Sequence, residues 1–332
     1  MQLIRMSIAA TATFLLWWVY SATVPFCGVS RFVVWPVTSA ADLNPIINRL
    51  LAICPGSSIF GVGGHSVLLS ITEGIAAKVS HKPGDPHLRH EQTVFKLLDQ
   101  ASCPSVIRTF LHCPDVTFMQ LLRNGTLYQR MTMVNKPRPI LQWIHQLADA
   151  AACIESLEYA HGDINPRNIL FDDEDRLKLV DFDHALKAGD DLEVGDTPYV
   201  RAQKVGSKGG TFGVAGPVTE QFALGSVFWY ITRETELYAE LEGSERVNRL
   251  IDGQFPTTDP QDSIDNIISN CWLGDFGSIS DLSKCIREIS TFNEIDQERK
   301  TSNETYQERK KTCEQYYQLL KGPSYSYDSQ SS

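Results

Sequence analysis

Between about residues 42 and 120, short apolar runs alternate with Gly and Pro residues, a pattern that predicts short strands joined by turns. One stretch inside this region has a helical period instead. The residues that share one face of that helix are Leu88, Glu91, Val94, Phe95 and Leu98. The region is therefore expected to form a small β-rich lobe with one helix.

A second region, from residue 140 to 160, repeats its apolar residues at the spacing of a helix. Those residues are Ile140, Trp143, Ile144, Leu147, Ala151, Ile154 and Leu157. The predicted helix is followed by a charged loop and by two β-like segments, Ile169–Phe171 and Leu177–Val180. A charged loop placed between a helix and short strands is a place where chemistry is expected.

Residues 189–218 are rich in Gly, Asp and Thr and have no clear period. Loops of this length that only connect two elements are uncommon in compact domains, so we expect this segment to be functional. Helical spacing returns at 220–232 and 262–272 and predicts a second lobe that is mainly helical. From residue 293 the chain turns polar, and we expect a solvated helix that frays into a disordered tail.

Composition narrows the classes of function. The chain has 332 residues, of which 42% are hydrophobic, enough to bury a sizeable core. Its formal net charge of -10 leaves no overall basic surface, so nucleic acid is not expected as a partner. The 8 cysteines form no C-x-x-C pair and no cluster with zinc spacing, and we expect free thiols in a reducing compartment.

The strongest chemical signal is the segment 161–170, H-G-D-I-N-P-R-N-I-L, followed after a short hairpin by K-L-V-D-F-D. Asp163, Asn168 and Asp181 are the oxygen-bearing side chains of these two segments. A carboxylate that orients an acceptor hydroxyl, together with oxygen ligands for magnesium, supplies most of what phosphoryl transfer needs. The alternative is that these residues only form turns, as Asp and Asn often do.

Together the two segments resemble the catalytic loop and the D-F-G segment of the protein-kinase-like superfamily, and the chain resembles divergent protein-kinase-domain proteins of filamentous fungi. The resemblance covers about residues 45–290. It implies an α+β, bilobal protein-kinase-like fold, with a small β-rich N-lobe that has one helix and a larger, mainly helical C-lobe. The domains it implies are a hydrophobic segment at 1–40, the N-lobe at 41–122, the C-lobe at 123–292 and a polar, partly helical or disordered tail at 293–332.

The same resemblance implies roles for individual residues. Asp163 would be the catalytic aspartate, and Asn168 and Asp181 would hold the metal. Lys78, in G-I-A-A-K-V, resembles the third-strand lysine that holds the α- and β-phosphates, and Glu91 would orient it. The cofactors implied are ATP and Mg²⁺, with Mn²⁺ as a second metal that would serve.

Two further segments would hold the nucleotide. Residues 59–67 stand where the glycine-rich, phosphate-covering loop is expected, and the candidate binding residues there are Gly61, Gly63, Gly64 and Val67. Residues 116–127 resemble the strand that leads into the hinge, with Met119 behind the adenine and Gln120 and Leu122 along its edge. An ordinary core strand accounts for Met119 equally well.

Several positions depart from the family pattern. Gly162 replaces the arginine onto which a phosphorylated activation loop docks, and Asn165 replaces a lysine that contacts the γ-phosphate. Ser66 takes the third glycine position of the phosphate-covering loop. Asp183 replaces the D-F-G glycine, where it would be an extra metal ligand or a helix-start residue. No clear A-P-E motif is found, and its nearest alignment is Arg201-Ala-Gln. The loss of a cation at the γ-phosphate predicts slow chemistry.

Three functions stay open on this basis. The favoured one is a protein kinase that phosphorylates protein hydroxyls, with serine and threonine preferred to tyrosine, on a protein substrate that the sequence does not identify. The second is a small-molecule phosphotransferase of the aminoglycoside or choline kinase type, whose loops often read H-G-D and which would need an acceptor pocket. The third is a pseudokinase that binds nucleotide without catalysis.

The N-terminal segment is a separate question. Residues 6–30 have no charged side chain and are long enough to span a bilayer. One interpretation of this segment is a membrane anchor. The competing interpretations are an apolar extension packed on the domain and a misplaced start codon. A cleaved signal peptide ranks behind these, because a kinase exported from the cytosol would lose its supply of ATP. We expect a cytoplasmic kinase domain with this segment as a candidate anchor.

Overall fold

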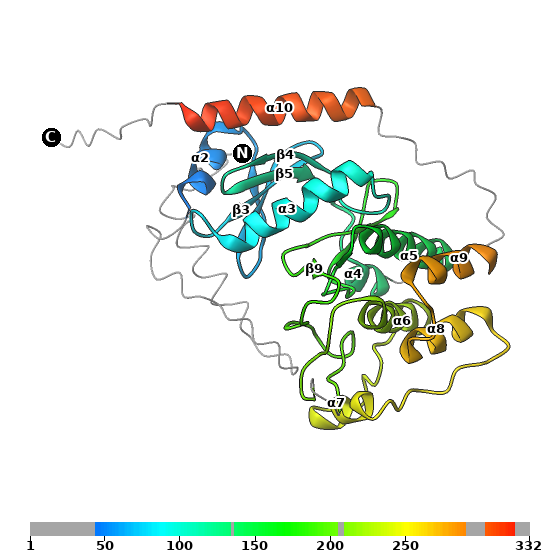
Figure 1. Ribbon diagram of the computed structural model, residues 1–332. Coiled ribbons are helices and arrows are strands. Elements are labelled where there is room, and N and C mark those ends of the chain that lie inside the picture. Colours follow the sequence, from blue (N-terminus) through cyan, green and yellow to red (C-terminus); the bar gives the residue numbers. More distant parts are fainter. Residues whose placement is uncertain (1–43, 134–135, 205–208, 290–302, 323–332) are drawn as a thin grey trace.

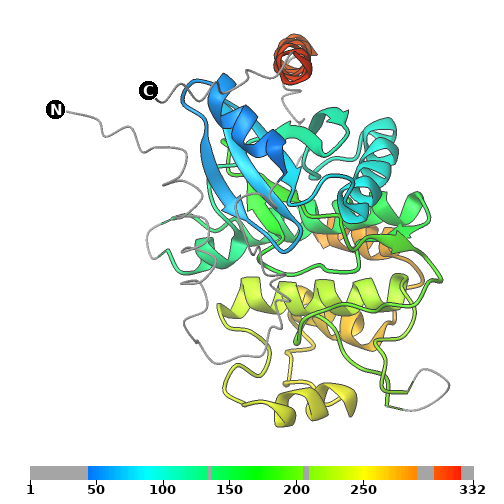
Figure 2. The ribbon, with the colours of Figure 1, turned by 90° about the vertical axis from the view of Figure 1, so that its left-hand side faces the viewer.

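The computed structural model describes residues 44–133, 136–204, 209–289 and 303–322 (Figure 1). The apolar segment 6–30 lies outside these residues. Among the residues that are described, none belongs to a helix both long and apolar enough to cross a membrane. The chain folds into two lobes, one built on a sheet and the other on helices (Figures 1 and 2), which confirms the expected bilobal α+β fold.

A five-stranded antiparallel sheet forms the N-lobe, with the strand order β1-β2-β3-β5-β4. The strands are β1 (Ser58–Val62), β2 (Ser66–Thr72), β3 (Ile75–Ser80), β4 (Thr109–Cys113) and β5 (Val116–Gln120). Residues of β2, β3 and β5 are buried on nearly every position. Because side chains of a strand alternate between two faces, both faces of this sheet must be covered.

Helix α3 (Pro86–Ala101) is the helix that the apolar period predicts, and it packs with the inner face of the sheet in one core. The side chain of Asp85 caps its start by accepting a hydrogen bond from the backbone N–H of His87, at 2.8 Å. Pro86, at the first turn, needs no hydrogen-bond acceptor there. The buried residues of α3 are Leu88, Glu91, Val94, Phe95 and Leu98, the same set as on the predicted face.

The outer face of the sheet is covered by two helices, α2 (Pro45–Ile53) and α10 (Asn303–Lys321), which lie across it in Figures 1 and 2. The sequence pattern did not single out α2. The expectation of a solvated C-terminal helix is wrong, because α10 buries Cys313 and Leu320 in a core shared with β4 and α2. The apolar outer face supplies the reason: left uncovered, it would expose a row of apolar side chains to water.

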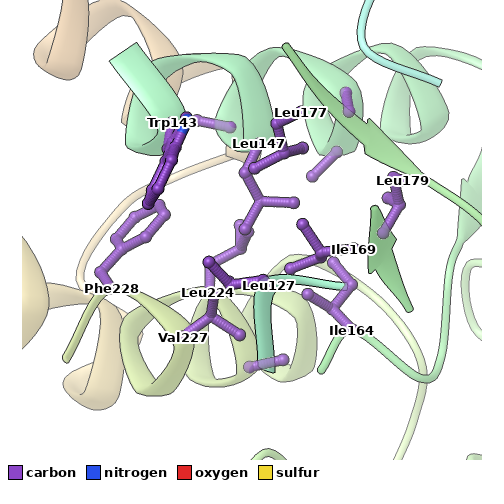
Figure 3. Close-up of a cluster of buried hydrophobic side chains, with 14 of the residues drawn as sticks. Leu127, Trp143, Leu147, Ile164, Ile169, Leu177, Leu179, Leu224, Val227 and Phe228 are labelled. Atoms are coloured by element: carbon purple, nitrogen blue, oxygen red, sulfur yellow. The ribbon is translucent and has the colours of Figure 1, made fainter. Parts of the chain in front are cut away.

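Helices α5 (Ile140–Ser156) and α6 (Pro217–Arg233) form the centre of the C-lobe, and both were expected from their spacing. Figure 3 shows Trp143 and Leu147 of α5 facing Leu224 and Phe228 of α6. The remaining helices of the C-lobe are α4 (Leu127–Met131), α7 (Ser244–Ile251), α8 (Ser263–Leu273) and α9 (Ile279–Ile289). Helix α8 packs on α6, and α9 packs on α5.

Four short strands position the loops between the lobes. β7 (Ile169–Phe171) and β8 (Leu177–Leu179) form the hairpin expected after the charged loop, and β6 (Tyr159–Ala160) pairs with β9 (Leu186–Lys187). The backbone N–H of Val180 donates to the carbonyl of Asn168, at 3.0 Å. These pairings hold the segment 161–168 against the segment 180–185.

One cysteine pair differs from the expectation of free thiols. Cys103, just after α3, is joined by a disulfide to Cys153 of α5, and their Cα atoms are 5.7 Å apart. Five other cysteines in the described part of the chain are free thiols. Spacing in the sequence could not indicate the pair, because the two residues belong to different lobes and meet only in the folded chain.

Candidate active site

Lys78 lies at the centre of the site, on the inner face of β3. Its Nζ atom is 2.7 Å from Oε1 of Glu91 on α3 and 2.7 Å from Oδ1 of Asp181 after β8. The backbone N–H of Phe182 donates to the same Glu91 oxygen, at 3.1 Å. The sheet, α3 and the segment after β8 therefore meet at one lysine, and three residues named from the sequence lie in direct contact.

Burial and charge act differently on the three groups. Burial by itself lowers the pKa of Lys78, but the carboxylates of Asp181 and Glu91 outweigh it and raise that pKa above its usual value. The Glu91 side chain is only 1% exposed, and burial raises its pKa although Lys78 opposes the shift. Burial raises the pKa of the Asp181 carboxyl, but the charge of Lys78 prevails and the net pKa is lowered. Lys78 and Asp181 therefore form an ion pair.

Asp163 is held in the charged loop by two amides. Asn165 Nδ2 donates to its Oδ1 at 2.9 Å, and Asn168 Nδ2 donates to its Oδ2 at 2.7 Å. Burial raises the pKa of Asp163 to about 6, although the hydrogen bonds from Asn165 and Asn168 oppose the shift. The carboxylate is therefore ionised at neutral pH and fixed in one orientation.

The role of Asn165 differs from that of the lysine it replaces. Besides its bond to Asp163, its Oδ1 accepts a hydrogen bond from the backbone N–H of Arg167, at 2.9 Å. The side chain is buried and ties two parts of the loop together. It supplies a positioning amide at Asp163 where the family pattern places a cation.

Glu220, in the first turn of α6, supports the charged loop, a role that the helical spacing of 220–232 did not indicate. Its carboxylate accepts hydrogen bonds from the backbone N–H groups of His161, at 2.9 Å, and Gly162, at 3.2 Å. Burial raises the pKa of Glu220 to about 7, although these two bonds oppose the shift. An acidic residue inside a helix that is apolar on all sides was the available signal, because such a group needs buried partners.

His161 joins the loop to the rest of the site. Its Nε2 donates to the carbonyl of Val180 at 3.0 Å, an assignment that follows because a carbonyl can only accept. Its ring lies 4.8 Å from the ring of Phe182, which in turn lies 5.4 Å from Phe95 of α3. Burial lowers the pKa of His161 to about 4, so the ring is neutral. A continuous column of rings thus links the charged loop to α3.

The glycine-rich segment forms the turn between β1 and β2. The backbone N–H of Gly63 donates to the carbonyl of Ser66 at 2.8 Å, and Gly61 lies opposite Leu68 in the sheet. His65, at the turn, stacks on His87 at the start of α3 with ring centroids 3.8 Å apart. The turn is therefore tied to the helix that carries the glutamate partner of Lys78.

The structure corrects one nucleotide-binding assignment. Val67 pairs with Val79 and belongs to the outer core, under α2 and α10, whereas Leu68 pairs with Lys78 and packs with the inner core. Strand side chains alternate, so a slip of one residue moves a side chain to the other face. Leu68, not Val67, therefore lies on the face of the sheet that carries Lys78.

The segment after β5 forms the connection between the lobes. Met119 is buried on the inner face, opposite Ala76. The backbone N–H of Gln120 donates to the carbonyl of Arg108, at 2.9 Å. Leu122 is buried, and its backbone N–H donates no hydrogen bond within the described residues.

Asp183 does not begin a helix, and that interpretation is wrong. It lies in a turn in which the backbone N–H of Ala185 donates to the carbonyl of Phe182, at 3.2 Å. Its Oδ1 is buried and makes no hydrogen bond within the described part of the chain, and Nε2 of His184 lies 3.8 Å away. The second interpretation, an additional oxygen ligand for a metal, stays a prediction.

Comparison with known proteins agrees with this arrangement. The sequence model of the family described as "Protein kinase domain" matches residues 65–312. The chain belongs to the protein kinase domain family. The match therefore covers most of the sequence, from β2 to the first half of α10.

Curated relatives are protein kinases by name. The chain is 30% identical over 144 residues to MAP kinase kinase kinase win1 of Schizosaccharomyces pombe, covering 40% of this chain and 10% of that protein. It is 23% identical over 198 residues to dual specificity protein kinase pyk3 of Dictyostelium discoideum, covering 57% and 14%. It is 34% identical over 105 residues to serine/threonine-protein kinase PKH3 of Eremothecium gossypii, covering 30% and 14%. The chain thus matches about a tenth to a seventh of the length of these relatives.

The kinase domain family uses ATP and a divalent metal, and the oxygen donors of this chain fit such a metal. Asn168 Nδ2 donates to Asp163, which leaves the amide oxygen of Asn168 for a cation, and only Oδ1 of Asp181 is bonded to Lys78. Among the described residues, no group of three or more His, Cys, Asp or Glu side chains could hold a metal. Two protein oxygens completed by phosphates and water are a common way of binding Mg²⁺.

The activation segment of the kinase domain is anchored by aromatic contacts where the A-P-E motif is missing. The guanidinium carbon of Arg201 lies 4.9 Å from the ring centroid of Phe222 and 5.7 Å from that of Phe255. The hydroxyl of Tyr199 donates to Oε1 of Glu236, at 3.1 Å. Arg201 thus packs on Phe222 of α6 and on Phe255 through cation–π contacts.

Proposed function

We propose that this kinase domain transfers the γ-phosphoryl group of ATP to protein hydroxyls, with Mg²⁺ or Mn²⁺ bound at the phosphates. The observation that carries the proposal is the contact of Lys78 with both Glu91 and Asp181, at 2.7 Å each, beside an oriented Asp163. Phosphoryl transfer depends on positioning and on electrostatic stabilisation more than on covalent chemistry by the protein. The four side chains supply the parts that such a reaction requires.

The nucleotide is proposed to lie between the sheet and the C-lobe. Leu68 and Met119 contact the adenine, and the free N–H of Leu122 hydrogen-bonds its edge. Gly61, Gly63 and Gly64 are proposed to bring backbone N–H groups close to the phosphates, because glycine permits close approach.

Lys78 would then contact the α- and β-phosphates from the other side. The metal would be held by the amide oxygen of Asn168 and by the carboxylate oxygen of Asp181 that is not bonded to Lys78. A metal bound there neutralises charge on the phosphates.

Asp163 is proposed to orient the acceptor hydroxyl and to accept its proton. A hollow beside Asp163 is bounded by the activation segment and α6 and has room for about one water molecule. Sites for small molecules usually enclose about 300–1,000 Å³. This hollow therefore does not form the acceptor pocket that the small-molecule alternative would need, which favours a protein acceptor.

Serine and threonine are proposed as the preferred acceptors. The names of the relatives support this in part, since they include a serine/threonine-protein kinase and a dual specificity protein kinase. We also propose that the domain works in the cytoplasm, where ATP is supplied. Analysis of the phosphorylated amino acids after transfer separates serine and threonine from tyrosine.

A pseudokinase is the second candidate, and two observations favour it. Asn165 donates a hydrogen bond to Asp163, and it occupies the position where the family pattern has a cation for the γ-phosphate. Asp183 adds a buried carboxylate near Lys78. Both changes weaken the attraction of the site for a transferring phosphoryl group. Under this alternative the domain binds nucleotide and transfers nothing.

Substitution of Asp163 by Asn in the full chain tests the proposal. The amide keeps the size of the side chain but cannot accept a proton, so nucleotide affinity should change little while transfer falls by at least about a hundredfold. Affinity is measured with a fluorescent nucleotide and transfer with radiolabelled ATP. Equal transfer by wild type and Asp163→Asn would refute the assignment of this loop, and nucleotide binding without transfer by wild type would favour the pseudokinase.

A further inference from the structure

Helix α10 follows the C-lobe in sequence but packs on the N-lobe, along β4 and α2 (Figures 1 and 2). Its Tyr306 ring lies 5.6 Å from that of Phe110, and the guanidinium of Arg108 lies 5.2 Å from the Tyr306 ring centroid. At the other end of the helix, Arg49 of α2 donates a hydrogen bond to the carbonyl of Gly322, at 3.0 Å. The helix is therefore attached at both ends.

A second residue of α10 reaches the turn between β2 and β3. The guanidinium of Arg309 covers Gly74 so closely that a Cβ atom on Gly74 would lie 2.4 Å from Nη2. Gly74 has a φ of +70°, a conformation that glycine adopts without strain. The same guanidinium lies 6.0 Å from the ring centroid of Phe110. Arg309 thus packs against both the turn and β4.

The two residues that Arg309 and Tyr306 of α10 contact, Gly74 and Arg108, each accept a hydrogen bond from the segment that connects the lobes. Gly74, which Arg309 covers, accepts through its carbonyl from the backbone N–H of Leu121 at 3.2 Å. Arg108, whose guanidinium packs on the Tyr306 ring, accepts through its carbonyl from the backbone N–H of Gln120 at 2.9 Å. These two bonds fix the backbone immediately before Leu122, which carries the donor proposed for the adenine edge.

We propose that α10 positions the adenine-binding backbone, and that Tyr306 and Arg309 are positioning residues for nucleotide affinity. The inference rests on the proposed binding of ATP. Packing of Arg309 on Gly74 and of Tyr306 on Arg108 restrains two carbonyls, and these carbonyls hold the N–H groups of the connecting segment. A site that is held in its binding geometry loses less entropy when a ligand enters.

Removal of the Arg309 or the Tyr306 contact should make the segment that connects the lobes more mobile without unfolding the N-lobe. The reason is that Cys313 and Leu320 still anchor α10 in the outer core. Local opening of a segment increases the exchange of its amide hydrogens with solvent. The variants Arg309→Ala and Tyr306→Ala should therefore speed exchange at Leu121 and Gln120 respectively. Tyr306→Phe keeps the ring on Arg108 and Phe110 and should behave as wild type.

Hydrogen exchange and nucleotide affinity are measured together on the full chain, with ADP as the probe. We expect about tenfold faster exchange at the affected amide and about tenfold weaker binding of ADP for Arg309→Ala, corresponding to a loss of about 1.4 kcal/mol. In a transfer assay the KM for ATP should rise while kcat stays the same. Lys311→Ala, at an exposed position of the same helix, is the matched control and should change none of these values.

The two proposals fail in different ways. If wild type binds no nucleotide, the proposed function fails, whatever the exchange shows. If wild type binds ADP and both alanine variants bind it equally well with unchanged exchange at Gln120 and Leu121, α10 is only a cover for the sheet and this inference is overturned. Equal losses for Lys311→Ala would also overturn it, because they would show a general effect of substitutions on α10.

Discussion

Residues around Asp163 set the protonation state in which the charged loop works. Burial raises the pKa of Asp163 to about 6, and the amide of Asn165 opposes this by donating to the charged form. A proton acceptor must be ionised, so the protonated form that builds up below pH 6 is inactive. Transfer should therefore be constant above about pH 7 and fall as the pH drops through about 6.

Asn165→Ala tests this account of Asp163. Without the amide the charged carboxylate loses a hydrogen bond, so the pKa should rise and the acid limb of the rate profile should move upward by about one pH unit. The profile of kcat/KM against pH measures the shift. Asn266→Ala, at an exposed position of α8, is the control. An acid limb that does not move would show that Asp163 is not the group that titrates.

Neighbouring residues Leu68 and Val67 allow a direct test of which face of β2 meets the nucleotide. Leu68→Ala removes an apolar side chain from the site and should weaken ATP binding about tenfold with little change in stability. Val67→Ala leaves a cavity in the outer core and should lower the free energy of unfolding by roughly 2 kcal/mol while ATP affinity stays the same. Fluorescent-nucleotide titration and urea unfolding measure the two effects. The reverse outcome would restore Val67 as the binding residue.

At the scale of secondary-structure elements, α6 supports the charged loop through one carboxylate. Glu220→Ala would leave the backbone N–H groups of His161 and Gly162 buried without acceptors, which should lower the free energy of unfolding by roughly 3 kcal/mol and abolish transfer. Chemical unfolding followed by fluorescence measures the loss. Val218→Ala, 53% exposed on the first turn of α6, should have little effect. A wild-type stability for Glu220→Ala would show that the loop does not depend on α6.

Sequence patterns predicted those elements whose partners are close in the chain. The apolar face of α3, the helices α5 and α6 and the hairpin after the charged loop follow from helical spacing and from runs of apolar residues. Val67 was misplaced because a shift of one residue reverses the face of a strand. Lys78 contacts both Glu91 and Asp181, and all three residues had been named from the order of their motifs in the sequence.

Elements whose partners are distant in sequence were the ones missed. The stripe of Tyr306, Cys313 and Leu320 on α10 is narrow, and the surrounding charged residues conceal it. Only the apolar outer face of the sheet shows what this stripe covers. Glu220 was missed for the same reason, since its partners are backbone groups 58 and 59 residues away.

The two lobes as a whole are joined by more than the connecting segment. The disulfide between Cys103 and Cys153 links the end of α3 to α5 and closes a loop of 50 residues. In the chain-entropy description, such a loop stabilises the fold by about 4 kcal/mol. Because α3 carries Glu91, the bond also limits how far that helix can move from the C-lobe.

Reduction of this disulfide is therefore expected to lower the melting temperature of the wild-type chain. The double variant Cys103→Ser, Cys153→Ser should melt at the lower temperature with or without reductant. Peptide mapping under non-reducing conditions identifies the pair. Two free thiols at these positions, with a melting temperature that reductant does not change, would support the expectation of free cysteines instead.

The central claim is that the whole molecule is an active protein kinase built around Lys78, Asp163 and Asp181. The most direct measurement is transfer of radiolabelled γ-phosphate from ATP to generic protein acceptors by the purified full chain, with Mg²⁺ or Mn²⁺, beside Asp181→Ala. We predict label on protein serine or threonine with wild type and none above background with Asp181→Ala. Bound nucleotide without labelled protein, or equal label with both chains, would contradict the claim.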